Sequence, residues 1–104
     1  MSKHAHRYRI TVTPVEENGL QCLGRCTIEL EHSCQDDWMR LLERMQQQRG
    51  LTGDERAALT VGTQLLSGLM RDHHKDTDDV FAPLRPHMGE FIQGLKRRNS
   101  AAGQ

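Results

Sequence analysis

The fold is decided by two alternating segments, RYRITVT at residues 7–13 and RCTIELE at residues 25–31. In the first segment, Tyr8, Ile10 and Val12 alternate with polar residues, and apolar and polar residues alternate in the same way in the second. Alternation with a period of two is typical of β-strands with one buried and one solvated face. We therefore predict that the first third of the chain forms an antiparallel β-hairpin.

The turn of this hairpin is predicted at Asn18-Gly19, because both residue types tolerate the positive φ angles of tight turns. Matching the apolar faces of the two strands predicts that Glu16 pairs with Leu20 around a three-residue loop. Further pairs in this predicted register are Tyr8 with Ile28, Arg7 with Glu29, and His4 with His32.

Three amphipathic helices are predicted after the hairpin: one at residues 33–48, one from Thr52 to about Arg71, and a last helix with Pro86 in its first turn. Capping boxes are expected at the first two N-termini, with Ser33 and Asp36 in one and Thr52 and Glu55 in the other. Gly50 is expected to stop the first helix, and the basic run at 96–98 suits the C-terminal end of the last. The apolar stripes of the first and last helices are Trp38, Leu41, Leu42 and Met45, and Met88, Phe91, Ile92 and Leu95.

These elements predict an α+β fold, an N-terminal antiparallel β-hairpin followed by three amphipathic helices packed on one face of the hairpin. A chain of 104 residues favours a single domain, residues 1–104. We expect an ordered core from about residue 4 to residue 98, and a disordered tail at residues 99–104.

The composition favours a soluble cytoplasmic protein. Fourteen basic and fourteen acidic residues give a formal net charge of zero, whereas nucleic-acid binders usually carry a basic excess. The start, Met1-Ser2-Lys3-His4, lacks the apolar stretch of a signal peptide, and no segment has the apolar length of a transmembrane helix. Three cysteines form an odd set, which is less typical of a secreted domain.

The cysteines do not predict a disulfide or a shared zinc ion. Cys22 and Cys26 are four residues apart on one strand, which is about 13 Å along an extended chain. We expect both to be small buried hydrophobes. Cys34 is expected to be partly exposed at the junction of strand and helix, and no neighbouring motif supports a reactive thiol there.

Several stretches resemble one known family. They are the run His6–Pro14, the segments Gly24-Arg25-Cys26 and Glu31-His32, and the run Phe81–Pro86 leading into Gly89-Glu90-Phe91. Together, over roughly Lys3 to Lys96, the chain resembles a small family of bacterial proteins known as domain of unknown function 3861. The resemblance implies a compact bacterial domain, and it carries no activity, ligand or functional residue to this chain.

The sharpest chemical candidate is a histidine cluster. His4 and His6 share one face of a strand, and the predicted register brings His32 opposite His4. Three imidazoles from neighbouring strands are a plausible divalent-metal site. The alternative, which we favour, is that His4 lies in a fraying terminus and His6 lines the end of the core. No cofactor is therefore predicted.

The remaining candidates have ordinary explanations. The connector at residues 72–79 holds two histidines and four aspartates, but its spacing does not match a calcium loop, and a solvated acidic loop explains it better. Arg7, Arg9 and Arg25 could contact phosphates, but cross-strand pairing with Glu29 and Glu31 and ordinary solvation explain them better. No exposed aromatic residues interleave to stack bases.

No catalytic motif is present, so the sequence leans away from an enzyme. We predict a small cytoplasmic protein-interaction or regulatory module, with a metal- or small-ligand-binding protein as the alternative. Because a lone hairpin leaves two strand edges open, a homodimer and a monomer with protected edges are expected about equally. Neither a nucleic acid nor a membrane is expected as a partner.

Overall fold

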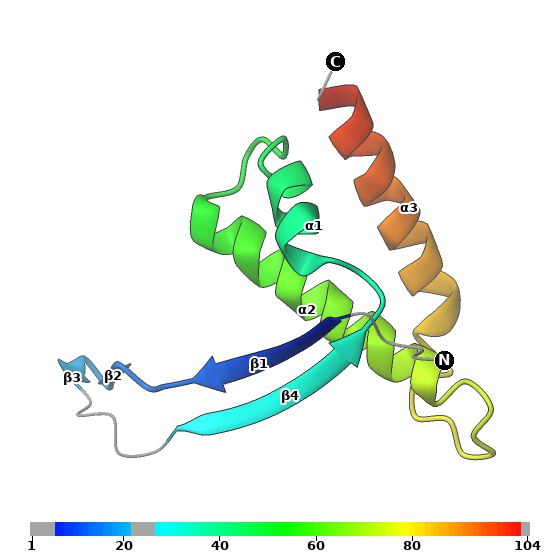
Figure 1. Ribbon diagram of the computed structural model, residues 1–104, viewed down its shortest axis with the longest axis horizontal. Coiled ribbons are helices and arrows are strands. Elements are labelled where there is room, and N and C mark those ends of the chain that lie inside the picture. Colours follow the sequence, from blue (N-terminus) through cyan, green and yellow to red (C-terminus); the bar gives the residue numbers. More distant parts are fainter. Residues whose placement is uncertain (1–5, 22–26, 103–104) are drawn as a thin grey trace. The chain divides into compact units, whose positions relative to one another are not determined.

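The computed structural model describes residues 6–21 and 27–102, and it confirms the α+β class: an antiparallel hairpin is followed by three helices (Figure 1). The chain divides into two compact units, Met1–Asp36 with the strands and Asp37–Gln104 with the helices. Each unit is described by itself, and the single-domain organisation stays a prediction. No helix among the described residues is both long enough and apolar enough to span a bilayer.

The main hairpin pairs strand β1 (His6–Val12) with strand β4 (Ile28–Cys34) in antiparallel fashion. The predicted faces are correct, because even-numbered residues of both strands share one face. The predicted register is wrong, since Tyr8 lies opposite His32 rather than Ile28, four residues farther along the chain. A shift by an even number of residues keeps every side chain on its face, so the apolar pattern alone does not exclude it.

A second, shorter strand pair turns the chain around. Strands β2 (Glu16–Glu17) and β3 (Leu20–Gln21) are antiparallel, and Glu17 lies opposite Leu20. The turn is therefore the two residues Asn18 and Gly19, whose φ angles are +53° and +81°, and not the predicted three-residue loop. Positive φ at both central residues is the signature of a type I′ turn, whose twist suits a hairpin.

Helix α1 (Trp38–Met45) begins five residues later than predicted, because strand β4 runs through Cys34. Its N-cap is Asp37, whose carboxylate accepts hydrogen bonds from the backbone N–H groups of Met39 (3.1 Å) and Arg40 (3.3 Å). The predicted capping box at Ser33 is thus wrong. The helix also ends at Met45, before the predicted Gln48, and Gly50 (φ +88°) lies in the connection to the next helix.

Helix α2 (Gly53–Asp72) begins as predicted with a complete capping box. The Thr52 hydroxyl accepts a hydrogen bond from the backbone N–H of Glu55 (3.1 Å), and the Glu55 carboxylate accepts one from the backbone N–H of Thr52 (2.8 Å). Two backbone donors of the first turn are satisfied reciprocally, which explains why this boundary can be predicted from four residues.

Helix α3 (Arg85–Ala102) continues four residues into the predicted tail, with Pro86 in its first turn. Asn99 explains part of the extension, because its side-chain oxygen accepts a 2.5 Å hydrogen bond from the amide of Gln48, which is buried. The alanines that follow are strong helix formers. The predicted end at the basic run of residues 96–98 is therefore wrong, since these residues precede the last turn.

The helical unit is centred on one aromatic and three sulfur-containing side chains. Trp38 and Met45 of α1, Met70 of α2 and Met88 of α3 are each at most 8% exposed. Methionine fills irregular space because it is unbranched and flexible. The scarcity of aromatic residues in the sequence is thus accompanied by a methionine-rich set of buried residues. Leu59, Leu65 and Leu66 of α2 lie at intermediate exposure, and Leu69 is 44% exposed.

Candidate functional site

The hairpin presents an apolar row on one face. Ile10 lies opposite Leu30 and Val12 lies opposite Ile28, so four aliphatic side chains form two cross-strand pairs. Val12 is 52% exposed, Ile28 63% and Leu30 41%. Among the described strands, β1 and β4 pair only with each other, so each has one unpaired edge. Exposed aliphatic residues beside open strand edges are typical of a surface that other chains can join.

The opposite face carries an ion cluster of two arginines and one glutamate. The Glu31 carboxylate accepts hydrogen bonds from the guanidinium groups of Arg9 (3.2 Å) and Arg7. The hydrogen bond from Arg9 and then that from Arg7 lower the pKa of Glu31 below its usual value. The predicted pairing of Arg7 with Glu29 is wrong, because Glu29 lies opposite Thr11. The single Glu31 carboxylate is hydrogen-bonded to both guanidinium groups and offsets one of their two charges. Arg25, the third arginine of the predicted phosphate-contacting patch, lies outside the described residues.

The structure describes two of the three histidines of the predicted cluster. His4 lies outside the described residues. His6 lies opposite Cys34 and stacks on Tyr8 with 6.1 Å between ring centroids, while His32 lies opposite Tyr8. The register that suggested the cluster is therefore wrong. Within residues 6–21 and 27–102, no group of three or more histidine, cysteine or acidic residues could hold a metal ion. The site at His4, His6 and His32 stays a prediction.

Cys34 is buried, not partly exposed as predicted, and its thiol donates to the backbone carbonyl of Asp36 at 3.4 Å. Because β4 continues through this position, Cys34 belongs to the strand and not to a solvated junction. Cys22 and Cys26 lie outside the described residues.

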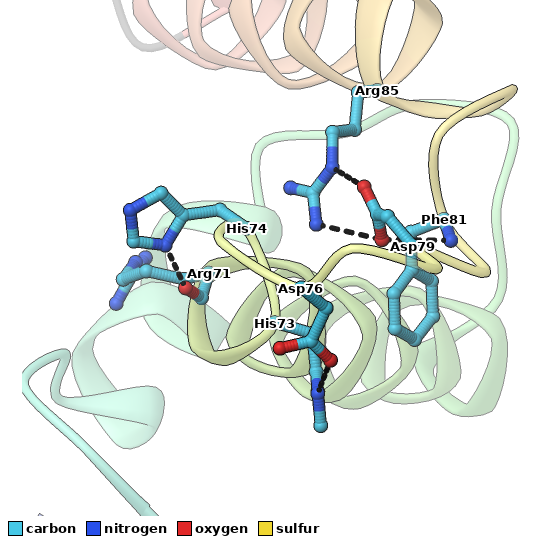
Figure 2. A network of polar contacts seen from close by, with 7 residues as sticks. All are labelled: Arg71, His73, His74, Asp76, Asp79, Phe81 and Arg85. Carbon is cyan, nitrogen blue, oxygen red and sulfur yellow. Dashed lines mark hydrogen bonds and ion pairs between the residues drawn. The ribbon is translucent and has the colours of Figure 1, made fainter.

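A polar network organises the connection between α2 and α3 (Figure 2). The Asp79 carboxylate accepts two hydrogen bonds from the Arg85 guanidinium, at 2.5 Å and 3.1 Å, and one from the backbone N–H of Phe81 at 3.0 Å. The hydrogen bond from Arg85 is the main reason that the pKa of Asp79 is lowered and that of Arg85 is raised. Asp79 thus closes the turn that leads into α3.

Two histidines complete this network, each with a local partner. The Nδ1 atom of His73 lies 2.7 Å from a carboxylate oxygen of Asp76, and that of His74 lies 2.7 Å from the backbone carbonyl of Arg71 (Figure 2). The connector was predicted to be a solvated acidic loop, and its residues are indeed largely exposed. The network fixes the loop through contacts within it, and it leaves no converging set of ligands for a cation.

The fold and these surfaces define a small α+β protein. The chain belongs to the family known as domain of unknown function 3861 (DUF3861), whose profile matches residues 6–97. The resemblance expected from the sequence is thereby confirmed.

One solved structure has a fold similar to that of this chain. The chain is similar to a protein of unknown function (eca1910) from Pectobacterium atrosepticum SCRI1043, with 26% sequence identity and a TM-score of 0.73. The match covers 88% of this chain and 97% of the other. No curated protein matches the sequence. The comparisons therefore establish family and fold, and they assign no specific function.

Proposed function

We propose that the protein is a small interaction module that binds through its β1–β4 hairpin, and that its partner is a second copy of this chain. The observation that carries the proposal is the apolar row beside open strand edges, in which Val12 and Ile28 are more than half exposed. A two-stranded sheet is marginal by itself in water. Pairing of two hairpins gives a four-stranded sheet with a twofold axis between the two copies. The apolar row then continues from one copy to the other.

Charge favours the β1 edge for this pairing. If two copies of β1 pair in antiparallel fashion about Ile10, Tyr8 lies opposite Val12 of the second copy and Arg9 lies opposite Thr11, so no like charges meet. Pairing of β4 about Leu30 would instead place Glu29 opposite Glu31 of the second copy. Like charges directly opposite are destabilising in a sheet. The formal net charge of zero adds no long-range repulsion between copies.

Two opposite substitutions at one exposed position test this geometry. Thr11→Arg places two like-charged pairs across the proposed axis, whereas Thr11→Glu places two opposite-charged pairs there. We expect the dimer dissociation constant to rise with Thr11→Arg and to fall with Thr11→Glu, each by roughly 2- to 30-fold, from two pairs of about 0.2–1 kcal/mol each. Sedimentation equilibrium of the full chain over a concentration series measures both changes.

The same substitutions have the reverse effect within one hairpin, which supplies the control. Thr11 lies opposite Glu29 of its own β4, so Thr11→Arg gains an opposite charge there and Thr11→Glu meets a like charge. A change in hairpin stability would therefore move dimerisation in the direction opposite to the expected one. The proposal is wrong if the wild-type chain stays monomeric at several hundred micromolar. That concentration is roughly ten times the dissociation constant of a weak dimer.

We also propose that the module works in the bacterial cytoplasm. The solved relative comes from a bacterium, which supports a bacterial origin. The buried thiol of Cys34 and the odd number of cysteines are typical of a reducing compartment.

A further inference from the structure

The helical unit contains a cavity of about 70 Å³ where its three helices meet. Its apolar lining comes from Leu41 and Met45 of α1 and from Ile92 and Leu95 of α3. The polar residues that line it are Thr60, Thr63 and Gln64 of α2 and Lys96 and Asn99 of α3. A single water needs about 10–15 Å³ of such space, so the cavity exceeds what one or two waters would fill. The three helices belong to the same compact unit.

The polar groups of this lining are largely used by the protein itself. The Thr60 hydroxyl donates to the backbone carbonyl of Arg56 (2.8 Å), and the Thr63 hydroxyl donates to that of Leu59 (2.7 Å). Asn99, at the same cavity, accepts from Gln48 and donates to the sulfur of Met45. Because these donors already have partners, the polar groups left for an occupant are the amide of Gln64 and the ammonium group of Lys96, and the rest of the lining offers mainly apolar contact.

The side chain of Lys96 places a positive charge at the opening of the cavity. Lys96 lines both the cavity and a wider depression of about 550 Å³, to which Glu43, Arg44 and Gln47 also contribute. No ion pair to Lys96 occurs among the described residues. Two basic groups and one acidic group give the depression a net positive charge at neutral pH. An apolar cavity below a cationic rim is complementary to a molecule with a short apolar chain and an anionic head.

We propose that this cavity binds a small amphiphilic anion of the carboxylate class, with its alkyl chain between the helices and its carboxylate near Lys96. All the residues that line the site belong to the helical unit, Asp37–Gln104. Neither the family nor the solved relative assigns it.

Hexanoate is the probe, and isothermal titration of the full chain is the measurement. We expect saturable binding with a dissociation constant of about 1 mM, in keeping with a ligand of about eight non-hydrogen atoms. Hexylamine has the same chain with the opposite charge, and acetate has the same head without the chain. Neither should bind measurably at the same concentrations.

Two variants locate the site. Lys96→Met should weaken hexanoate binding by roughly two- to fivefold, the effect of one exposed ion pair. Arg97→Met, which removes the neighbouring cation outside the cavity lining, should leave binding unchanged. Thr63→Leu should fill the cavity and abolish binding while circular dichroism shows the wild-type helix content.

The comparison of Lys96→Met with Arg97→Met tests the location of the site even if Thr63→Leu does not fold. The absence of saturable hexanoate binding overturns the proposal. Equal losses in the Lys96→Met and Arg97→Met variants, or tight binding of hexylamine, also overturn it, because either result shows nonspecific attraction in place of the cavity.

Discussion

Replacing Trp38 with alanine is expected to lower the free energy of unfolding by about 3–5 kcal/mol, the usual cost of truncating a buried aromatic side chain. Trp38 is 5% exposed and is the first residue of α1, directly after its N-cap. The loss combines the transfer of the indole from water with the cavity that remains. Urea unfolding followed by far-ultraviolet circular dichroism measures the change without relying on tryptophan fluorescence.

Met39→Ala is the matched control, because Met39 is the next residue on the same helix and is 63% exposed. Alanine is a slightly better helix former, so the free energy of unfolding should change by less than about 0.5 kcal/mol. Equal effects of the two substitutions would contradict the assignment of Trp38 to the centre of the helical unit.

Asp79→Asn is expected to lower the melting temperature clearly at neutral pH, whereas Asp76→Asn in the same loop should change it little. Asp79 is 14% exposed and its partner Arg85 is 28% exposed, while His73 and Asp76 are each about half exposed. A bidentate arginine–carboxylate pair away from water contributes more than an exposed pair of the same length. Thermal unfolding of the wild type and both variants makes the comparison.

The pH dependence gives a second check on this pair. Because the pKa of Asp79 is lowered in the folded chain, its carboxylate stabilises the fold above the usual aspartate pKa. That contribution is lost as the pH falls below about 4 and the carboxylate takes up a proton. The melting temperatures of wild type and Asp79→Asn should therefore converge with falling pH. If the difference in melting temperature stayed constant down to about pH 2, the effect of the asparagine would not come from the loss of the carboxylate charge.

Two features that depend on residues close together in the chain were located correctly from the sequence. The capping box of Thr52 and Glu55 and the turn at Asn18 and Gly19 are local, and both were located correctly. The alternation in β1 and β4 also predicted which side chains share a face. Each of these features depends on a short-range rule of backbone geometry or hydrogen bonding.

Features that depend on distant pairings were not predictable in this way. Alternation fixes the face of a strand but not the register, so Glu31 replaced Glu29 as the arginine partner. The predicted capping box at Ser33 was wrong for the same reason: recognising Asp37 as the N-cap requires knowing that β4 extends through Cys34.

The candidate surfaces were missed for the same reason. The alternating pattern predicts that Val12 and Ile28 face the core, and only their position at the outer end of the β1–β4 pair shows that they stay exposed. The cavity at Lys96 is formed by residues from three helices. The ion pair between Asp79 and Arg85 spans a turn, and the spacing of these two residues matches no known sequence motif. Neither arrangement leaves a signal in any one segment.

The short β2–β3 pair has a consequence for the order of folding events. The entropic cost of closing a loop grows with the logarithm of its length, and β1 must meet a strand that lies beyond the turn region. Once the Asn18-Gly19 turn has formed, Glu16 already lies beside Gln21, and the chain has reversed direction before Val12 meets Ile28. We therefore expect the hairpin to form from this turn, with β1 and β4 then pairing from Val12 and Ile28 toward His6 and Cys34, in microseconds if the strands behave as an ordinary hairpin.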